Sequence, residues 1–152
     1  MPIRGPLAHV DLSVSNPDHS IPFYEAFFTA LGYRRLDISP AFQGFKPSRA
    51  AWGIRLDSGA SFGVEVRPSS GDDRTRRHDR YARGMHHMAF HARSPEDVDR
   101  VHTAMCAVGA TVLDAPADYT GHHGYSPGYY AAFYADPDGV KLEVAFIPED
   151  NP

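Results

Sequence analysis

The chain has 152 residues, 42% of them hydrophobic and 22% charged, which is enough to bury one real core. Its net charge is −4, so we expect no large basic face and no nucleic-acid partner. No apolar run approaches the roughly 18 residues that cross a bilayer, and no basic-then-apolar signal opens the sequence. The single cysteine, Cys106, fits a reducing compartment. We therefore expect a soluble, cytoplasmic protein that binds no membrane, with Cys106 as a small buried residue of a helix.

Taken in chain order, the first half predicts a strand, a helix and three further strands. The first strand alternates, with His9, Asp11 and Ser13 on one face. The helix has apolar residues at spacings of three and four, and Gly32 ends it with a left-handed cap. The expected elements are a strand over 8–14, a helix over about 19–31, and strands near 33–38, 51–56 and 62–66.

The second half repeats this order after a charged stretch, 68–83, which we expect to be a linker or mobile loop. The repeat opens with an alternating strand in which His87, Ala89 and His91 share a face. A tight Asp-Pro-Asp-Gly turn precedes its last strand. The expected elements are a strand within 84–93, a helix with its apolar stripe over 98–108, and strands at 111–113, 129–135 and 140–144, with a long loop over 114–128.

One offset relates the chemically important residues of the two halves. It is 78 positions both from His9 to His87 and from Glu65 to Glu143. Two copies of one module normally pack about a pseudo-twofold axis, which brings equivalent strands together. The sequence therefore predicts a metal site made of these four residues. Imidazole and carboxylate ligands suit Zn, Ni, Co, Mn or Fe(II) rather than a thiolate-selecting site.

The motifs at 9–14, 87–90 and 136–143 resemble those of the vicinal oxygen chelate superfamily, which includes glyoxalase I, extradiol dioxygenases and the bleomycin and fosfomycin resistance proteins. The resemblance covers about residues 7–147. It implies an α+β fold in which two tandem βαβββ modules form a curved, open mixed sheet around a cleft, with the metal at its centre. We expect one domain over 1–152, with modules at about 7–67 and 84–147. The family's ligand directly precedes the apolar-small-apolar run, so the resemblance favours His87 over His86.

Within the superfamily, the resemblance to glyoxalase I implies a metal-dependent lyase or isomerase. Its four ligands would be His9, Glu65, His87 and Glu143, with Glu143 also serving as the base. The metal would stabilise an enediolate as a Lewis acid. The sequence departs from this subfamily at the first strand, where Ser13 occupies the face on which an arginine would bind the glutathione carboxylate.

Two alternatives stay open. An extradiol dioxygenase would hold Fe(II) with His9, His87 and Glu143, with His123 as an acid or base and Tyr134 as a hydrogen-bond donor behind the metal site. A metal-free resistance protein that sequesters a drug is the other alternative. Members of that kind lose the His and Glu ligands, whereas this chain keeps them.

The remaining expectations concern the ligand and the assembly. We expect a small-molecule substrate, contacted by Tyr125, Tyr129, Asp11 and Ser13. The loop 114–128 is rich in glycine and long, so it should close over the substrate. Because similar single-pair proteins form their sites as dimers, the resemblance also implies a homodimer.

Overall fold

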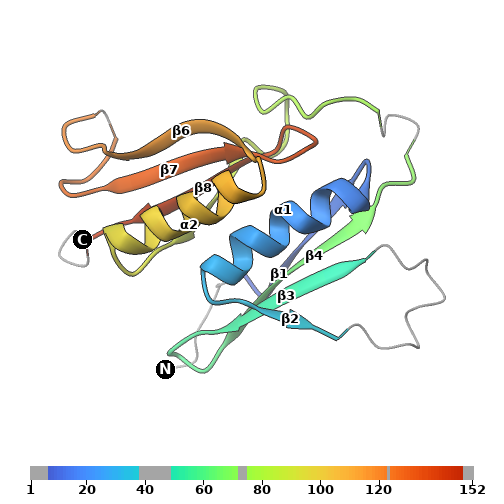
Figure 1. Cartoon of the computed structure of the whole chain (residues 1–152), viewed down its shortest axis with the longest axis horizontal. Coiled ribbons are helices and arrows are strands. Elements are labelled where there is room, and N and C mark those ends of the chain that lie inside the picture. The colour runs from blue at the N-terminus through green and yellow to red at the C-terminus, as the bar shows by residue number, and fades with distance from the viewer. Residues whose placement is uncertain (1–6, 38–48, 72–74, 123, 149–152) are drawn as a thin grey trace. The chain divides into compact units, whose positions relative to one another are not determined.

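The computed structural model describes residues 7–37, 49–71, 75–122 and 124–148. The chain divides into two compact units, Met1–Thr75 and Arg76–Pro152. Each unit contains a four-stranded mixed sheet and one helix in its described residues (Figure 1). None of the described helices is long and apolar enough to cross a membrane.

The first unit has the order β-α-β-β-β. In its sheet, β1 pairs in parallel with β4, and β4, β3 and β2 pair antiparallel in turn. The first and last strands of the unit are therefore neighbours. The elements are β1 (His9–Val14), α1 (Pro17–Ala30), β2 (Arg34–Leu36), β3 (Ala50–Arg55) and β4 (Ser61–Pro68).

Helix α1 begins two residues before the predicted start because Asn16 caps it. The Asn16 side chain accepts a hydrogen bond of 3.0 Å from the backbone N–H of Asp18. Pro17 occupies the first turn, where its missing N–H costs nothing. Gly32, with φ of 84°, follows the C-terminal end as predicted.

The core of the first unit lies between α1 and one face of its sheet, and it is rich in aromatic side chains. Trp52 on β3 is fully buried and lies 5.5 Å from Phe28 and 6.4 Å from Tyr24 between ring centroids. Its indole N–H donates to Glu25 of the same helix at 2.7 Å. These contacts fix the helix-covered face, and alternation leaves every second residue of each strand on the opposite, open face.

The second unit repeats the topology of the first. Strand β5 pairs in parallel with β8, and β8, β7 and β6 pair antiparallel in turn. Helix α2 packs on this sheet through Val98, Val101 and Met105, which are fully buried. The elements are β5 (His87–His91), α2 (Pro95–Ala107), β6 (Thr111–Asp118), β7 (Tyr130–Ala135) and β8 (Lys141–Phe146). The prediction of two tandem βαβββ modules is confirmed.

Two expectations from the sequence are wrong. Cys106 is exposed rather than buried, because it follows Met105 by one position and so points about 100° away from the buried stripe of α2. Strand β6 continues to Asp118 instead of ending near Leu113, and register irregularities between β6 and β7 accommodate the longer pairing. The loop that we expected over 114–128 is therefore shorter.

Candidate functional site

His87 and Glu143 meet on the open face of the second sheet. In the parallel register, His87 lies opposite Lys141 and Glu143 lies opposite Ala89, so the imidazole reaches the carboxylate diagonally. The Nε2 atom of His87 lies 3.1 Å from Oε2 of Glu143. The Glu143 residue is only 2% exposed, whereas the His87 side chain is 36% exposed. The pair thus joins a buried carboxylate to an imidazole that solvent can reach.

Tyr129 holds the other oxygen of this carboxylate. Its hydroxyl donates to Oε1 of Glu143 at 2.5 Å. Burial, followed by the hydrogen bond to Glu143, raises the pKa of Tyr129 above its ordinary value. The phenol therefore stays protonated at neutral pH and acts as a donor. Both oxygens of Glu143 are oriented, one by a phenol and one by an imidazole.

His86 supports His87 from the other side of the ring. The Nδ1 atoms of the two histidines lie 2.7 Å apart. If His87 is neutral and its Nε2–H donates to Glu143, its Nδ1 must accept from His86. If Nε2 instead presents its lone pair to a metal, the proton moves to Nδ1, which then donates to His86. Desolvation, and then His87, lower the pKa of His86, so His86 tends to the neutral form that can take either role.

Aromatic side chains of the segment 119–129 continue from Tyr129. The ring centroid of Tyr125 lies 4.6 Å from that of Tyr129 and 5.2 Å from that of Tyr119. Burial, and then the charge of Glu143, raise the pKa of Tyr125. Two of the predicted substrate contacts, Tyr125 and Tyr129, thus lie together beside Glu143.

Small and apolar residues occupy the strand positions around Glu143. Ala89 lies directly opposite on β5, and Phe133 lies directly opposite on β7. Ala131, Phe133 and Ala145 form a buried hydrophobic cluster, and Tyr129 packs against it. Lys141 is on the same face, where its ammonium lies 4.0 Å from the centre of the Phe133 ring. Glu143 therefore sits among apolar side chains and directed hydrogen bonds, with the ammonium of Lys141 as a cation on the same face.

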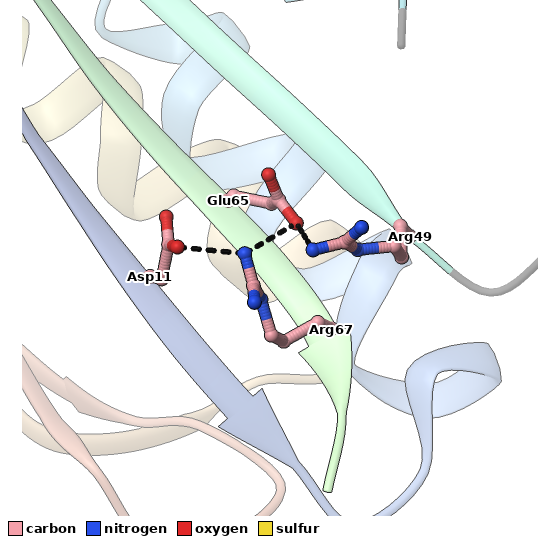
Figure 2. A network of polar contacts seen from close by, with 4 residues as sticks. All are labelled: Asp11, Arg49, Glu65 and Arg67. Carbon is pink, nitrogen blue, oxygen red and sulfur yellow. Dashed lines mark hydrogen bonds and ion pairs between the residues drawn. The ribbon is translucent and has the colours of Figure 1, made fainter. Parts of the chain in front are cut away.

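The equivalent carboxylate of the first unit, Glu65, is in a charged setting. Its Oε1 atom accepts from Nη2 of Arg49 at 2.6 Å and from Nη2 of Arg67 at 3.1 Å (Figure 2). The same Arg67 nitrogen also donates to Asp11 on β1 at 2.7 Å. We name these four residues, Asp11, Arg49, Glu65 and Arg67, the arginine network.

His9 and Glu65 are not joined as their counterparts are. His9 lies on the open face, opposite Gly63 in the parallel register, just as His87 lies opposite Lys141. Within the described residues, however, no ion pair links His9 to Glu65. Nor does any group of three or more His, Cys, Asp and Glu side chains that could hold a metal occur in the described part of the chain. The predicted four-residue metal site stays a prediction.

The other predicted site residues are dispersed. Tyr134 is fully buried on the helix-covered face of the second sheet, where its hydroxyl lies 3.2 Å from Nδ1 of His102 on α2. The structure therefore does not bring Tyr134 to Glu143. Ser13 is exposed on the open face of the first sheet, opposite Arg67. His123 lies outside the described residues.

Sequence reasoning missed the two arginines. A signal for one of them was present, because the separation of 56 positions between Asp11 and Arg67 equals that between His9 and Glu65. Arg67 also follows Glu65 by two positions, which puts both on one face of a strand. Arg49 precedes β3, and no pattern in the sequence indicates its contact with Glu65.

Comparisons with known proteins agree on one family and one fold. The family model for the Glyoxalase/Bleomycin resistance protein/Dioxygenase superfamily matches residues 7–144. The protein YqjT of Bacillus subtilis (strain 168) is 28% identical over 138 residues, covering 90% of this chain and 94% of YqjT. A Bacillus halodurans structure aligns with a TM-score of 0.69 at 24% identity, over 94% of this chain and 96% of that one. A glyoxalase/bleomycin resistance protein from Albidiferax ferrireducens T118 gives a TM-score of 0.59 at 24% identity, over 93% and 98% of the two chains.

Proposed function

Because the chain belongs to the glyoxalase/bleomycin resistance protein/dioxygenase superfamily, we propose that it is a divalent-metal-dependent enzyme, a lyase or isomerase that acts on a small oxygenated substrate. In this proposal His87 and Glu143 are metal ligands, and Glu143 also carries a proton. The observation that supports it is the buried Glu143 carboxylate with the His87 imidazole 3.1 Å from one oxygen.

The spacing of these two atoms suits a shared metal ion. Two ligand atoms that each lie about 2.1 Å from one ion are about 3.0 to 3.4 Å apart in tetrahedral or octahedral geometry. The observed 3.1 Å between Nε2 and Oε2 falls in this range. An imidazole and a carboxylate form a donor set for Zn, Ni, Co, Mn or Fe(II). His9 is the proposed further ligand, since it is the counterpart of His87 in the repeat.

The chemistry follows from how the chain holds Glu143. A bound divalent ion would supply Lewis acidity that polarises a carbonyl oxygen of the substrate. Tyr129 fixes Oε1, so Oε2 is the atom directed toward His87. An oriented carboxylate with little access to water can accept a proton from a carbon next to a carbonyl and return it to the neighbouring carbon. The tyrosines beside it, Tyr125 and Tyr129, would contact the substrate.

The test measures metal and activity on the same preparations. Protein purified without chelator should contain metal, and the dialysed protein should bind about one divalent ion per chain. His87→Ala and Glu143→Gln should each weaken metal binding by about 100-fold or more, because a site with few ligands loses most of its chelation with one of them. His91→Ala is the matched control, as His91 is an imidazole on the same strand and face. Equal affinity in all four proteins would contradict the assignment.

Activity is assayed as the metal-dependent loss of a methylglyoxal–thiol adduct. We expect turnover with added metal and none after chelation. Glu143→Gln should abolish turnover even at metal concentrations that saturate the variant, because an amide cannot accept the proton. Turnover that survives in this variant would remove Glu143 from the role of base.

A second candidate function is favoured by the arginine network. If the ion pairs of Glu65 keep it from a metal, His9, His87 and Glu143 remain, and two histidines with one carboxylate are the ligand set of Fe(II) oxygenases. Oxygen uptake on catechols with Fe(II) distinguishes this ring-cleaving dioxygenase from the lyase or isomerase.

We also propose that the protein is a homodimer, which light scattering of the purified chain would test.

A further inference from the structure

The arginine network has no counterpart at the corresponding strand positions of the second unit. Asp11 lies opposite Glu65, as Ala89 lies opposite Glu143. Arg67 and Ala145 each follow the glutamate by two positions on the same strand. On the other neighbouring strand, Ala51 lies opposite Glu65, and Arg49 comes two positions before Ala51. In the second unit Phe133 lies opposite Glu143, and Ala131 comes two positions before Phe133. All three charged neighbours of Glu65 are therefore alanines around Glu143.

This difference changes what each carboxylate can bind. Two carboxylates directly opposite each other on one face, as Asp11 and Glu65 are, repel one another unless a cation lies between them. Arg67 supplies that cation, since one of its nitrogens donates to both (Figure 2). Arg49 adds a second guanidinium at Glu65, and its side chain is only 16% exposed. Two negative and two positive charges make the network neutral as it stands.

A divalent ion at Glu65 would meet both guanidinium groups. Arginine keeps its proton in proteins, so neither guanidinium can lose its charge to make room for a metal ion. Both ion pairs are made by Oε1 of Glu65, and neither is made by Oε2. What opposes a metal ion at Glu65 is therefore the positive charge of the two arginines, and not a lack of a carboxylate oxygen to bind it. At Glu143 the corresponding contacts come from a neutral phenol and an imidazole, and an imidazole is itself a metal ligand. Lys141 adds a cation to this face, but its ammonium is directed at the Phe133 ring.

We infer that Glu65 is the counter-ion that holds Arg49 and Arg67 on the open face of the first unit, and that it is not a ligand of the metal. The part that concerns the metal rests on the proposed function. The two glutamates related by the 78-position offset therefore have different roles. The metal-ligand set contains one carboxylate instead of two, so a bound dication keeps a net positive charge toward the substrate.

Metal affinity separates the two glutamates. Equilibrium dialysis with Zn²⁺, and separately with Co²⁺ and Fe²⁺, would be carried out on the full chain and on Glu65→Gln and Glu143→Gln. We expect Glu65→Gln to bind within about threefold of the unchanged protein, and Glu143→Gln to lose about 100-fold or more. Asp11→Asn is the matched control, because it changes the charge of the network without touching a proposed ligand. An equal loss in the two glutamine variants would overturn the inference while leaving the proposed function intact.

Thermal unfolding without metal tests the counter-ion role by itself. Glu65→Gln and Arg67→Met should each lower the Tm by about 2–5 °C, and the double variant should lower it by clearly less than the sum, because the second change removes a partner already lost. Additive effects would overturn the counter-ion role. If the unchanged chain binds none of the three metals, the proposed function fails. The Tm of the double variant, compared with the sum of the two single effects, then decides for or against the counter-ion role.

Discussion

The two units share a topology and carry a histidine and a glutamate at equivalent positions, yet they differ on both faces of their sheets. On the open face, Glu65 is ion-paired to two arginines, whereas Glu143 lies among alanines and aromatic rings, with Lys141 over the Phe133 ring. On the helix-covered face, α1 buries aromatic side chains such as Phe28, whereas α2 buries non-aromatic ones such as Val101 and Met105. A repeated backbone thus fixes where a residue points, and the neighbouring side chains decide its chemistry.

Replacing the largest core residue should have the largest effect on stability. Trp52→Ala should lower the free energy of unfolding by about 3–5 kcal/mol, through the cavity that it leaves and the loss of the bond to Glu25. Met105→Ala in the second unit should cost about 2–5 kcal/mol. Urea unfolding followed by circular dichroism measures both. A cost below about 1 kcal/mol for Trp52→Ala would show that the aromatic core of the first unit is not what holds α1 to its sheet.

Removing the tyrosine hydroxyl at Glu143 should have the next largest effect. Tyr129→Phe leaves a buried carboxylate oxygen without its donor, which should cost about 1–3 kcal/mol of unfolding free energy at pH 7. Tyr125→Phe is the control, because its ring packs against Tyr129 without a hydrogen bond to Glu143 in the described structure. Similar costs for the two variants would mean that Tyr129 contributes packing rather than a hydrogen bond.

Copying one charge of the first unit into the second should give a moderate effect. Ala89→Asp puts a carboxylate directly opposite Glu143 with no arginine between them, and like charges in this position should cost about 1 kcal/mol. Ala89→Asn, of almost the same size, should cost less. The difference between the two variants should shrink as the pH is lowered and carboxylates become protonated. A constant difference between pH 7 and pH 4 would assign the cost to shape and not to charge.

The smallest effect is expected for the reverse change in the first unit. Asp11→Asn removes an ion pair in which both side chains are more than a third exposed, so it should cost about 0.2–1 kcal/mol. The cost should fall further in 1 M NaCl, where exposed charges are screened. A cost of several kcal/mol that persists in salt would show that Asp11 has a structural role beyond this pair.

Much of the fold could be predicted from the sequence, because its signals are local and periodic. Alternation placed His9, Asp11 and Ser13 on one face, and the burial pattern of β1 agrees. Gly32, which has a positive φ of 84°, marked the end of the first helix. The end of β6 was missed, since its pairing with β7 is irregular and does not follow a simple alternation.

The candidate site was less predictable, because it depends on contacts between strands. The repeat identified Glu65 and Glu143 as equivalent positions, but it could not indicate that two arginines bind one of them. The sequence predicts Tyr134 near the metal. On β7, however, it is Phe133 that lies opposite Glu143, and Tyr134, the next residue, points to the other face of the sheet. Strand register, which the sequence does not state, decides both outcomes.

The pairing of the first strand with the last in each unit has a consequence for folding. His9 pairs with Gly63 and His87 with Lys141, so both sheets are completed by contacts 54 positions apart. Such non-local pairs form late, because the entropy of closing the intervening chain must be met first. The first unit can close during synthesis as soon as β4 has emerged, whereas β5 has no neighbour in its sheet until β8 has been made. A ribosome stalled before Lys141 would therefore carry one finished sheet and a strand, that of His87, which is still unpaired.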